Sequence, residues 1–77
     1  MSDETRDQQE KESLRVGKYM TAHAVGHVYM VRGRHSALGS IEWYQPWRTY
    51  VFQPDRDTEF SPDCLRSLAS FMEALHV

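Results

Sequence analysis

Three of the four histidines and the single cysteine are the residues of this 77-residue chain with the most obvious chemical potential. His23 and His27 could share a strand face, and His35 and Cys64 could add further metal ligands. Zinc sites, however, are recognised by compact spacings such as C-x-x-C or H-x-x-E-H, and none accompanies these residues. We therefore predict no metal site and no cofactor.

Cys64 also raises the possibility of nucleophilic catalysis. It follows a predicted helix start, where the helix dipole favours a thiolate, but the neighbouring Asp63 opposes that effect. A cysteine nucleophile needs an adjacent base, and the sequence identifies none. Cys64 is interpreted as a structural residue, and we predict no catalytic residues and no enzyme activity.

Aromatic and arginine side chains offer binding chemistry instead. The stretch from Leu38 to Pro54 holds five of the nine aromatic residues. They are Trp43, Tyr44, Trp47, Tyr50 and Phe52. Trp and Arg are enriched at binding hot spots, so Trp47 and Arg48, beside the rigid Pro46, are the first candidates. Tyr44, Arg32 and Arg34 complete the predicted binding site, whereas Trp43, Tyr50 and Phe52 are expected in the core.

The elements that position these residues are predicted to be three strands. One strand is expected over residues 23–32, because this run contains the strand-favouring residues Val25, Val28, Tyr29 and Val31. Gly26 within it is expected to form a bulge or a point of close approach. Residues 33–37 form a turn, and the aromatic stretch supplies the second and third strands. Because Pro46 fixes its φ angle, a loop of three to five residues is expected between them.

A helix is predicted after the strands. Ser61 can cap it, Pro62 suits its first position and Asp63 places an acid in the first turn. Apolar residues follow at helical spacing and predict one inward-facing stripe. They are Leu65, Leu68, Ala69, Met72 and Leu75, with Phe71 beside them. The predicted fold is α+β: a three-stranded antiparallel β-meander packed against one C-terminal α-helix.

The N-terminal segment is predicted to stand apart from this domain. Residues up to about Ser13 include no apolar residue except Met1, so ordering them would not be offset by burial. We predict a flexible, acidic and polar tail over residues 1–15, disordered up to about Ser13, and a single small domain over residues 16–77. The alternative for the tail is a short solvated helix ending at Gly17.

The formal charge of −2 is unevenly distributed. Residues 18–50 carry four basic side chains and one acidic one, while five acidic residues outnumber the basic ones both before and after them. A weakly basic middle could meet phosphate or an acidic protein surface. A lone cysteine cannot form an internal disulfide, and no leader or membrane-length apolar run is recognised, so a cytoplasmic protein without membrane association is expected.

About half of the chain, residues 38–75, resembles a group of small, mostly uncharacterised proteins encoded by bacteriophages and prophages. The resemblance rests on Leu38-Gly39, the run Trp43-Tyr44-x-x-Trp47-Arg48-x-Tyr50-x-Phe52, Pro54, Phe60, and Cys64-Leu65-Arg66 leading to Ala69 and Phe71. It implies a mobile-element origin and no particular activity. Val51 and Gln53 depart from the apolar residues expected at their positions.

These features favour a small non-enzymatic binding module that acts on a host or phage protein, for example by inhibiting a host defence or regulatory protein. The alternative is a nucleic-acid-binding protein that uses the aromatic and arginine face of its sheet, with bases stacked on rings and phosphates held by arginines. One helix covers only one face of a sheet, so the aromatic residues left on the other face also suggest a homodimer.

Overall fold

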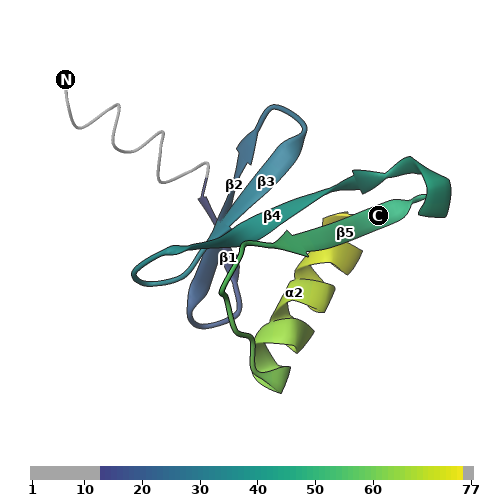
Figure 1. Cartoon of the computed structure of the whole chain (residues 1–77). Helices are drawn as coiled ribbons and strands as arrows, with labels where there is room; N and C mark the ends of the chain where they lie inside the picture. Colours follow the sequence, from purple (N-terminus) through teal and green to yellow (C-terminus); the bar gives the residue numbers. More distant parts are fainter. Residues whose placement is uncertain (1–12, 76–77) are drawn as a thin grey trace.

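The computed structural model describes residues 13–75, which form one antiparallel sheet of five strands and one C-terminal α-helix (Figure 1). The elements are β1 (Ser13–Val16), β2 (Met20–Val25), β3 (Val28–Arg32), β4 (Ala37–Tyr44), the short 3-10 helix η1 (Gln45–Trp47), β5 (Thr49–Pro54) and α2 (Pro62–Leu75). Each strand pairs with the next along the chain, in the order β1-β2-β3-β4-β5. The α+β class, the antiparallel meander and the C-terminal helix are confirmed, but the predicted number of three strands is wrong.

One of the two additional strands arises because Gly26 ends a strand instead of bulging within it. Val25 pairs directly with Val28, so Gly26 and His27 form a two-residue hairpin loop between β2 and β3. Gly26 has a φ of +64°, and His27 has no positive φ, which is the pattern of a type II′ turn. The run predicted as one strand over residues 23–32 is therefore a hairpin.

The other additional strand is β1, which pairs with β2 from Ser13↔His23 to Val16↔Met20. It includes residues 13–15, which were predicted to belong to the tail but form a strand. Gly17, with a φ of +68°, opens the loop of residues 17–19 that returns the chain into β2. The rest of the predicted tail lies outside the described residues.

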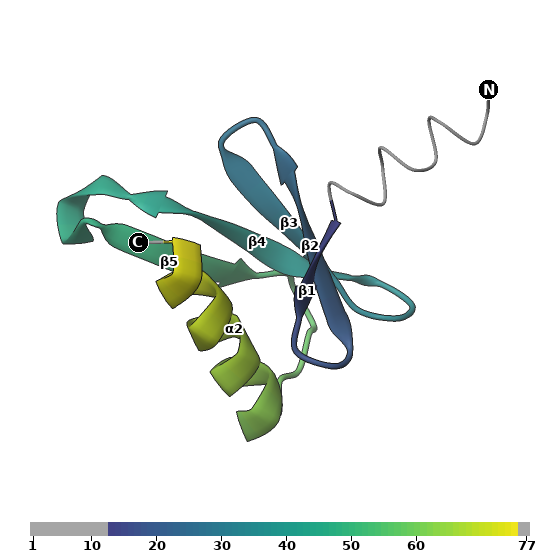
Figure 2. The ribbon, with the colours of Figure 1, turned by 180° about the vertical axis from the view of Figure 1, so that it is seen from behind.

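The register divides the sheet into two faces, because directly paired residues point the same way. The inner face carries the buried residues of the strands, and α2 lies across it (Figure 1). The buried core consists of Val16, Met20, Ala22, Val31, Ile41 and Leu68. Figure 2 shows that the sheet is strongly twisted, so the β2–β3 and β4–β5 turns point in different directions.

The helix begins as predicted. The Cys64 backbone N–H donates to the Ser61 hydroxyl at 3.2 Å, and the Leu65 N–H donates to the Ser61 carbonyl at 3.0 Å. Leu68 is buried, and Phe71, Met72 and Leu75 are partly buried against the core. Leu65 and Ala69, predicted to face inward, are instead exposed.

The outer face of the sheet has no helix over it in the described part of the chain (Figures 1 and 2). Its central rows, read from the register, are His23-Met30-Ser40-Gln53 and Val25-Val28-Glu42-Val51. Val25 and Met30 are exposed there, whereas Val28 and Val51 are partly covered. The predicted open face therefore exists, but it is a mixed polar and aliphatic surface with Tyr44 at one end.

Candidate binding surfaces

The β4–β5 hairpin ends in a tip built by the sequence Gln45-Pro46-Trp47-Arg48. Tyr44 pairs with Thr49, so four residues form the loop, within the predicted length. Pro46 lies in the first turn of η1, and the Arg48 N–H donates to the Gln45 carbonyl at 3.1 Å. The Trp43 indole N–H donates to the Gln45 side chain at 2.8 Å and fixes the start of the loop.

Trp47 is the most prominent side chain of this tip. Its exposed fraction is 71%, although its ring meets Tyr44 edge to face at a centroid distance of 5.1 Å. Beside the pair lies a shallow hollow of about 220 Å³, lined by Tyr44, Trp47, Val51, Phe52 and Gln53. The hollow runs along β5, an edge strand of the sheet. Aromatic surface, a concavity and a strand edge that no other strand of residues 13–75 pairs with therefore occur together.

Arg48 has a left-handed backbone conformation, with φ 52° and ψ 49°. A residue with a Cβ atom is disfavoured there by about 1–2 kcal/mol, and glycine or asparagine is usual. An arginine at such a position slightly lowers the stability of the native state. Strained positions are concentrated at functional sites, which supports a functional role for this side chain.

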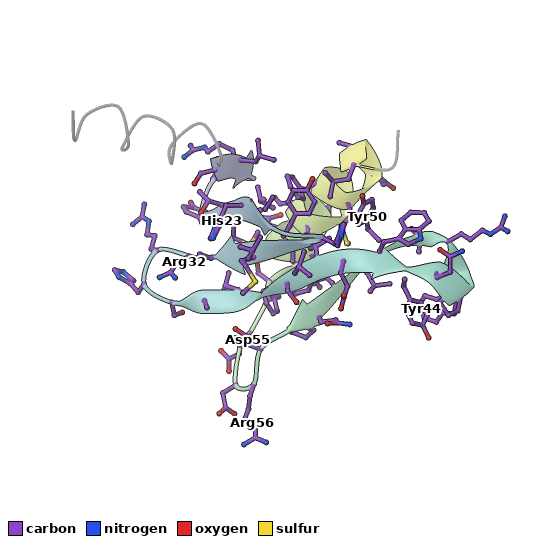
Figure 3. All side chains as sticks on the ribbon, turned by 90° about the horizontal axis from the view of Figure 1, so that it is seen from above. His23, Arg32, Tyr44, Tyr50, Asp55 and Arg56 are labelled. Carbon is purple, nitrogen blue, oxygen red and sulfur yellow. The ribbon has the colours of Figure 1, made fainter. Side chains whose placement is uncertain are left out.

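Arg32 and Arg34 do not join this tip. Figure 3 shows Arg32 and Tyr44 at opposite ends of β4. Arg32 ends β3, and Arg34 lies in the following loop, where its guanidinium sits 5.6 Å from the centre of the Tyr19 ring. The five predicted binding residues therefore belong to two surfaces: Tyr44, Trp47 and Arg48 form the tip, and Arg32 and Arg34 lie at the other end of the sheet.

This other end also holds basic residues that lie outside the predicted binding site. Thr21 pairs with Arg15 on one side and with Arg32 on the other. Because Val16, Ala22 and Val31 face the core, the alternation puts all three of these residues on the outer face. We use the name basic end for Arg15, Lys18, Arg32 and Arg34 together with Tyr19. Arg15 is absent from the predicted binding site because residues 1–15 were predicted to form the tail.

Two further hollows adjoin the basic end, on either side of the close approach between Gly17 and Ser67 of α2. One, of about 430 Å³, lies between β1 and α2, and the other, of about 420 Å³, lies between the β1–β2 loop and the start of α2. Arg66 lines both and pairs with Asp63 at 2.8 Å on the helix surface. Arg15 lines the first hollow and Lys18 the second, so the ion pair of Arg66 and Asp63 lies beside the basic end.

The histidines and Cys64 are distributed over different elements. His23 is on the outer face of β2, His27 is in the β2–β3 turn and His35 is in the β3–β4 loop, whereas Cys64 is on α2 across the sheet. Among residues 13–75, no group of three or more His, Cys, Asp or Glu side chains could share a metal ion.

Cys64 has a distinct electrostatic environment at the helix start. Hydrogen bonding to the side chain of Ser61, and then to its backbone, lowers the pKa of the Cys64 thiol below its ordinary value, while burial and the Asp63 carboxylate act in the opposite direction. The net lowering makes the thiolate easier to form. Cys64 lines the hollow of about 420 Å³ beside the start of α2, and the lowered pKa is a local effect of the helix cap.

We expect the substitution Ser61→Ala to shift the alkylation of Cys64 toward higher pH, since it removes the hydrogen bond that contributes most to the lowered pKa. The rate of iodoacetamide labelling, followed by mass spectrometry across a pH series, gives the midpoint directly. The matched control is the variant Ser61→Thr, which keeps a hydroxyl at this position and should keep the midpoint. Equal midpoints in the wild type and Ser61→Ala would contradict this cause.

Helix α2 spans 14 residues, and no helix within residues 13–75 has the length and apolar character needed to cross a membrane.

Comparison with known proteins gives one partial similarity. The chain is 37% identical, over 38 residues, to an uncharacterised 9.3 kDa protein of Acholeplasma phage L2. The aligned part covers 49% of this chain and 49% of the phage protein, so the chain spans about half the length of that relative. No family model matches the chain, and no solved structure matches it. The similarity supports a link to phage proteins, while the motif from Trp43 to Phe52 stays a sequence interpretation.

Proposed function

We propose that this chain is a small phage-derived binding protein that occupies a surface of a host or phage protein with the tip formed by Tyr44, Trp47 and Arg48. Inhibition of a host defence or regulatory protein is one form that this action would take. The observation that carries the proposal is the 71% exposed Trp47 beside a left-handed Arg48. The similarity of half of the chain to a phage protein supports the proposed origin.

The tip combines the features of a binding hot spot. Trp47 and Arg48 belong to residue types that dominate interface energies. The ring of Trp47 contacts Tyr44, and the backbone N–H of Arg48 donates to the Gln45 carbonyl. A partner that covers Trp47 would also reach the hollow along β5. Its own strand could extend the sheet at that edge, adding main-chain hydrogen bonds to the side-chain contacts.

The alternative of one continuous nucleic-acid track over aromatic and arginine residues is less well supported. The exposed rings of Tyr44 and Trp47 lie at one end of β4, and Arg32 lies at the other (Figure 3). Tyr50 and Trp43, the other predicted stacking residues, lie on the helix side of the sheet and meet each other edge to face at 5.2 Å. Tyr50 packs against the core, whereas Trp43, which was predicted to belong to the core, is 40% exposed. The two halves of the predicted surface are thus separated.

The variant Arg48→Gly gives the sharpest test of the proposed tip. Glycine suits a φ of 52°, so we expect the thermal midpoint to stay equal or to rise, while partner capture is lost with the side chain. The measurement is affinity capture from a bacterial lysate treated with nuclease, compared with the midpoint from circular dichroism. Trp47→Ala should likewise abolish capture with only a small change in midpoint.

The matched control is Leu65→Ala, which removes another exposed apolar side chain on a different element. It should leave capture unchanged. If Arg48→Gly and Trp47→Ala retain the captured protein, or reduce it only in proportion to lost folded protein, Tyr44, Trp47 and Arg48 are structural residues of the hairpin. Capture that disappears on nuclease treatment would instead favour a nucleic-acid partner.

A further inference from the structure

We infer that the basic end is a second, separate binding site, which takes the phosphate backbone of single-stranded nucleic acid. It lies at the opposite end of β4 from the tip and does not depend on the function proposed for the tip (Figure 3). The inference rests on the register of three strands, the position of the acidic residues and the exposed Tyr19.

The register spaces the cations in a defined way. Arg15, Thr21 and Arg32 are directly opposed on β1, β2 and β3, so the two arginines flank a hydroxyl and are separated by two strand spacings, or about 9.5 Å between their backbones. Both arginines are exposed. Two guanidinium groups on one sheet face, with a hydroxyl between them, can hold phosphate groups of one extended strand.

Lys18 and Arg34 extend this row beyond the ends of the strands. The loop of residues 17–19 and the β3–β4 loop lie at the same end of the sheet, and the contact between Arg34 and Tyr19 joins them. All four cations are exposed, and among residues 13–75 none of them forms an ion pair with a carboxylate. Their charge is therefore available to an anionic ligand.

Acidic side chains are displaced from this part of the sheet. Within the described residues, Glu42 is the single acidic residue of the five strands, and it lies in the row of Val25, Val28 and Val51, nearer the tip. The row next to Arg15 and Arg32 carries His23 and Met30 instead. Among residues 13–75, this part of the sheet therefore carries basic side chains without acidic ones, while Asp63 of α2, which lines a hollow with Lys18 and Tyr19, is paired with Arg66.

The exposed ring of Tyr19 favours a nucleic acid over an acidic protein as the ligand. Its side chain is 61% exposed at the rim, and the guanidinium of Arg34 sits over its ring. Bases that leave the stack pack on aromatic rings and on guanidinium planes, a contact that a carboxylate-rich protein surface does not need. Stacking also favours single strands, whose bases are accessible, over a duplex.

The test is binding of a fluorescein-labelled thymidine oligonucleotide to the full chain, measured by anisotropy over a series of salt concentrations. A length of about 15 nucleotides matches the upper range of site sizes for such surfaces. With three or four cations engaged and about 0.7 counterions released per phosphate, the slope of log K against log salt should be about −2 to −3. Arg15→Gln and Arg32→Gln should each reduce its magnitude by about 0.7.

Two further variants separate this site from nonspecific charge. Tyr19→Leu should weaken binding about tenfold at every salt concentration without changing the slope, because it removes stacking and no charge. Arg56→Gln is the matched control, since Arg56 is an exposed cation that lies between Asp55 and Asp57 in another loop (Figure 3). It should leave affinity and slope unchanged. Circular dichroism spectra establish that all variants are folded.

Three results would overturn the inference. The first is absence of binding at low salt, and the second is an Arg56→Gln effect as large as that of Arg32→Gln. The third is equal competition by polyglutamate of matched charge together with no effect of Tyr19→Leu. That third result would identify a general surface for anions, such as an acidic protein face.

Discussion

Truncation of Leu68 to alanine should lower the free energy of unfolding by about 2–4 kcal/mol. Leu68 is the buried residue of α2, with an exposed fraction of 2%, and belongs to the cluster that joins the helix to Val16 and Ile41. Its removal deletes apolar contacts and leaves a cavity beneath the helix. A domain this small has little stability to spare, so urea unfolding followed by far-ultraviolet circular dichroism should show a clear shift of the midpoint.

The same helix provides the control. Leu65 is the same residue type three positions earlier, but it is 52% exposed. Leu65→Ala should therefore change the free energy of unfolding by no more than about 0.5 kcal/mol. Equal losses for the two variants would mean that the helix packs with a different face toward the sheet.

The helix could be predicted from sequence because its determinants are local. The capping serine, the proline and the apolar spacing act within one element, and the structure confirms where it starts. The exposure of Leu65 could not be predicted in this way. Periodicity indicates which residues share a face, whereas the extent of sheet beneath that face depends on the partner element.

The number of strands depends on less local information. Strand-favouring residues such as Val25 and Val28 lie on both sides of Gly26, so composition alone suggests one long strand. A Gly-X pair between two such runs does predict a tight hairpin, and this pattern was available in Gly26-His27. Strand β1 is different, because Leu14 and Val16 are a weak pattern that becomes a strand through pairing with β2.

The separation of the predicted site follows from the topology. Arg32 precedes one end of β4 and Trp47 follows the other, so a meander necessarily places them apart. The sequence could not show that Arg15 and Arg32 lie on either side of Thr21. That placement depends on the presence of β1 and on the register of three strands. The tip was easier to predict, because Pro46 restricts its turn locally.

Substitution of Gly17 by alanine should destabilise the fold for two independent reasons. Gly17 has a φ of +68°, which disfavours any side chain by about 1–2 kcal/mol. A Cβ atom would also collide with Ser67 of α2, approaching its hydroxyl and lying 2.8 Å from its Cβ. Crowding of this kind typically adds about 1–3 kcal/mol. The expected total is about 2–5 kcal/mol, measured by urea unfolding.

Gly26→Ala isolates the backbone contribution. Gly26 has nearly the same φ, +64°, but an added Cβ would meet nothing within 4 Å, so only the loss of about 1–2 kcal/mol from conformation is expected. The difference between the two variants therefore measures how closely the β1–β2 loop approaches α2. The double variant Gly17→Ala with Ser67→Gly should recover part of the extra stability lost in Gly17→Ala. Substitutions at contacting residues have effects on stability that do not simply add. If Gly17→Ala and Gly26→Ala cost the same, and Ser67→Gly recovers nothing, the loop does not rest on the helix and the two hollows beside Ser67 merge into one open surface.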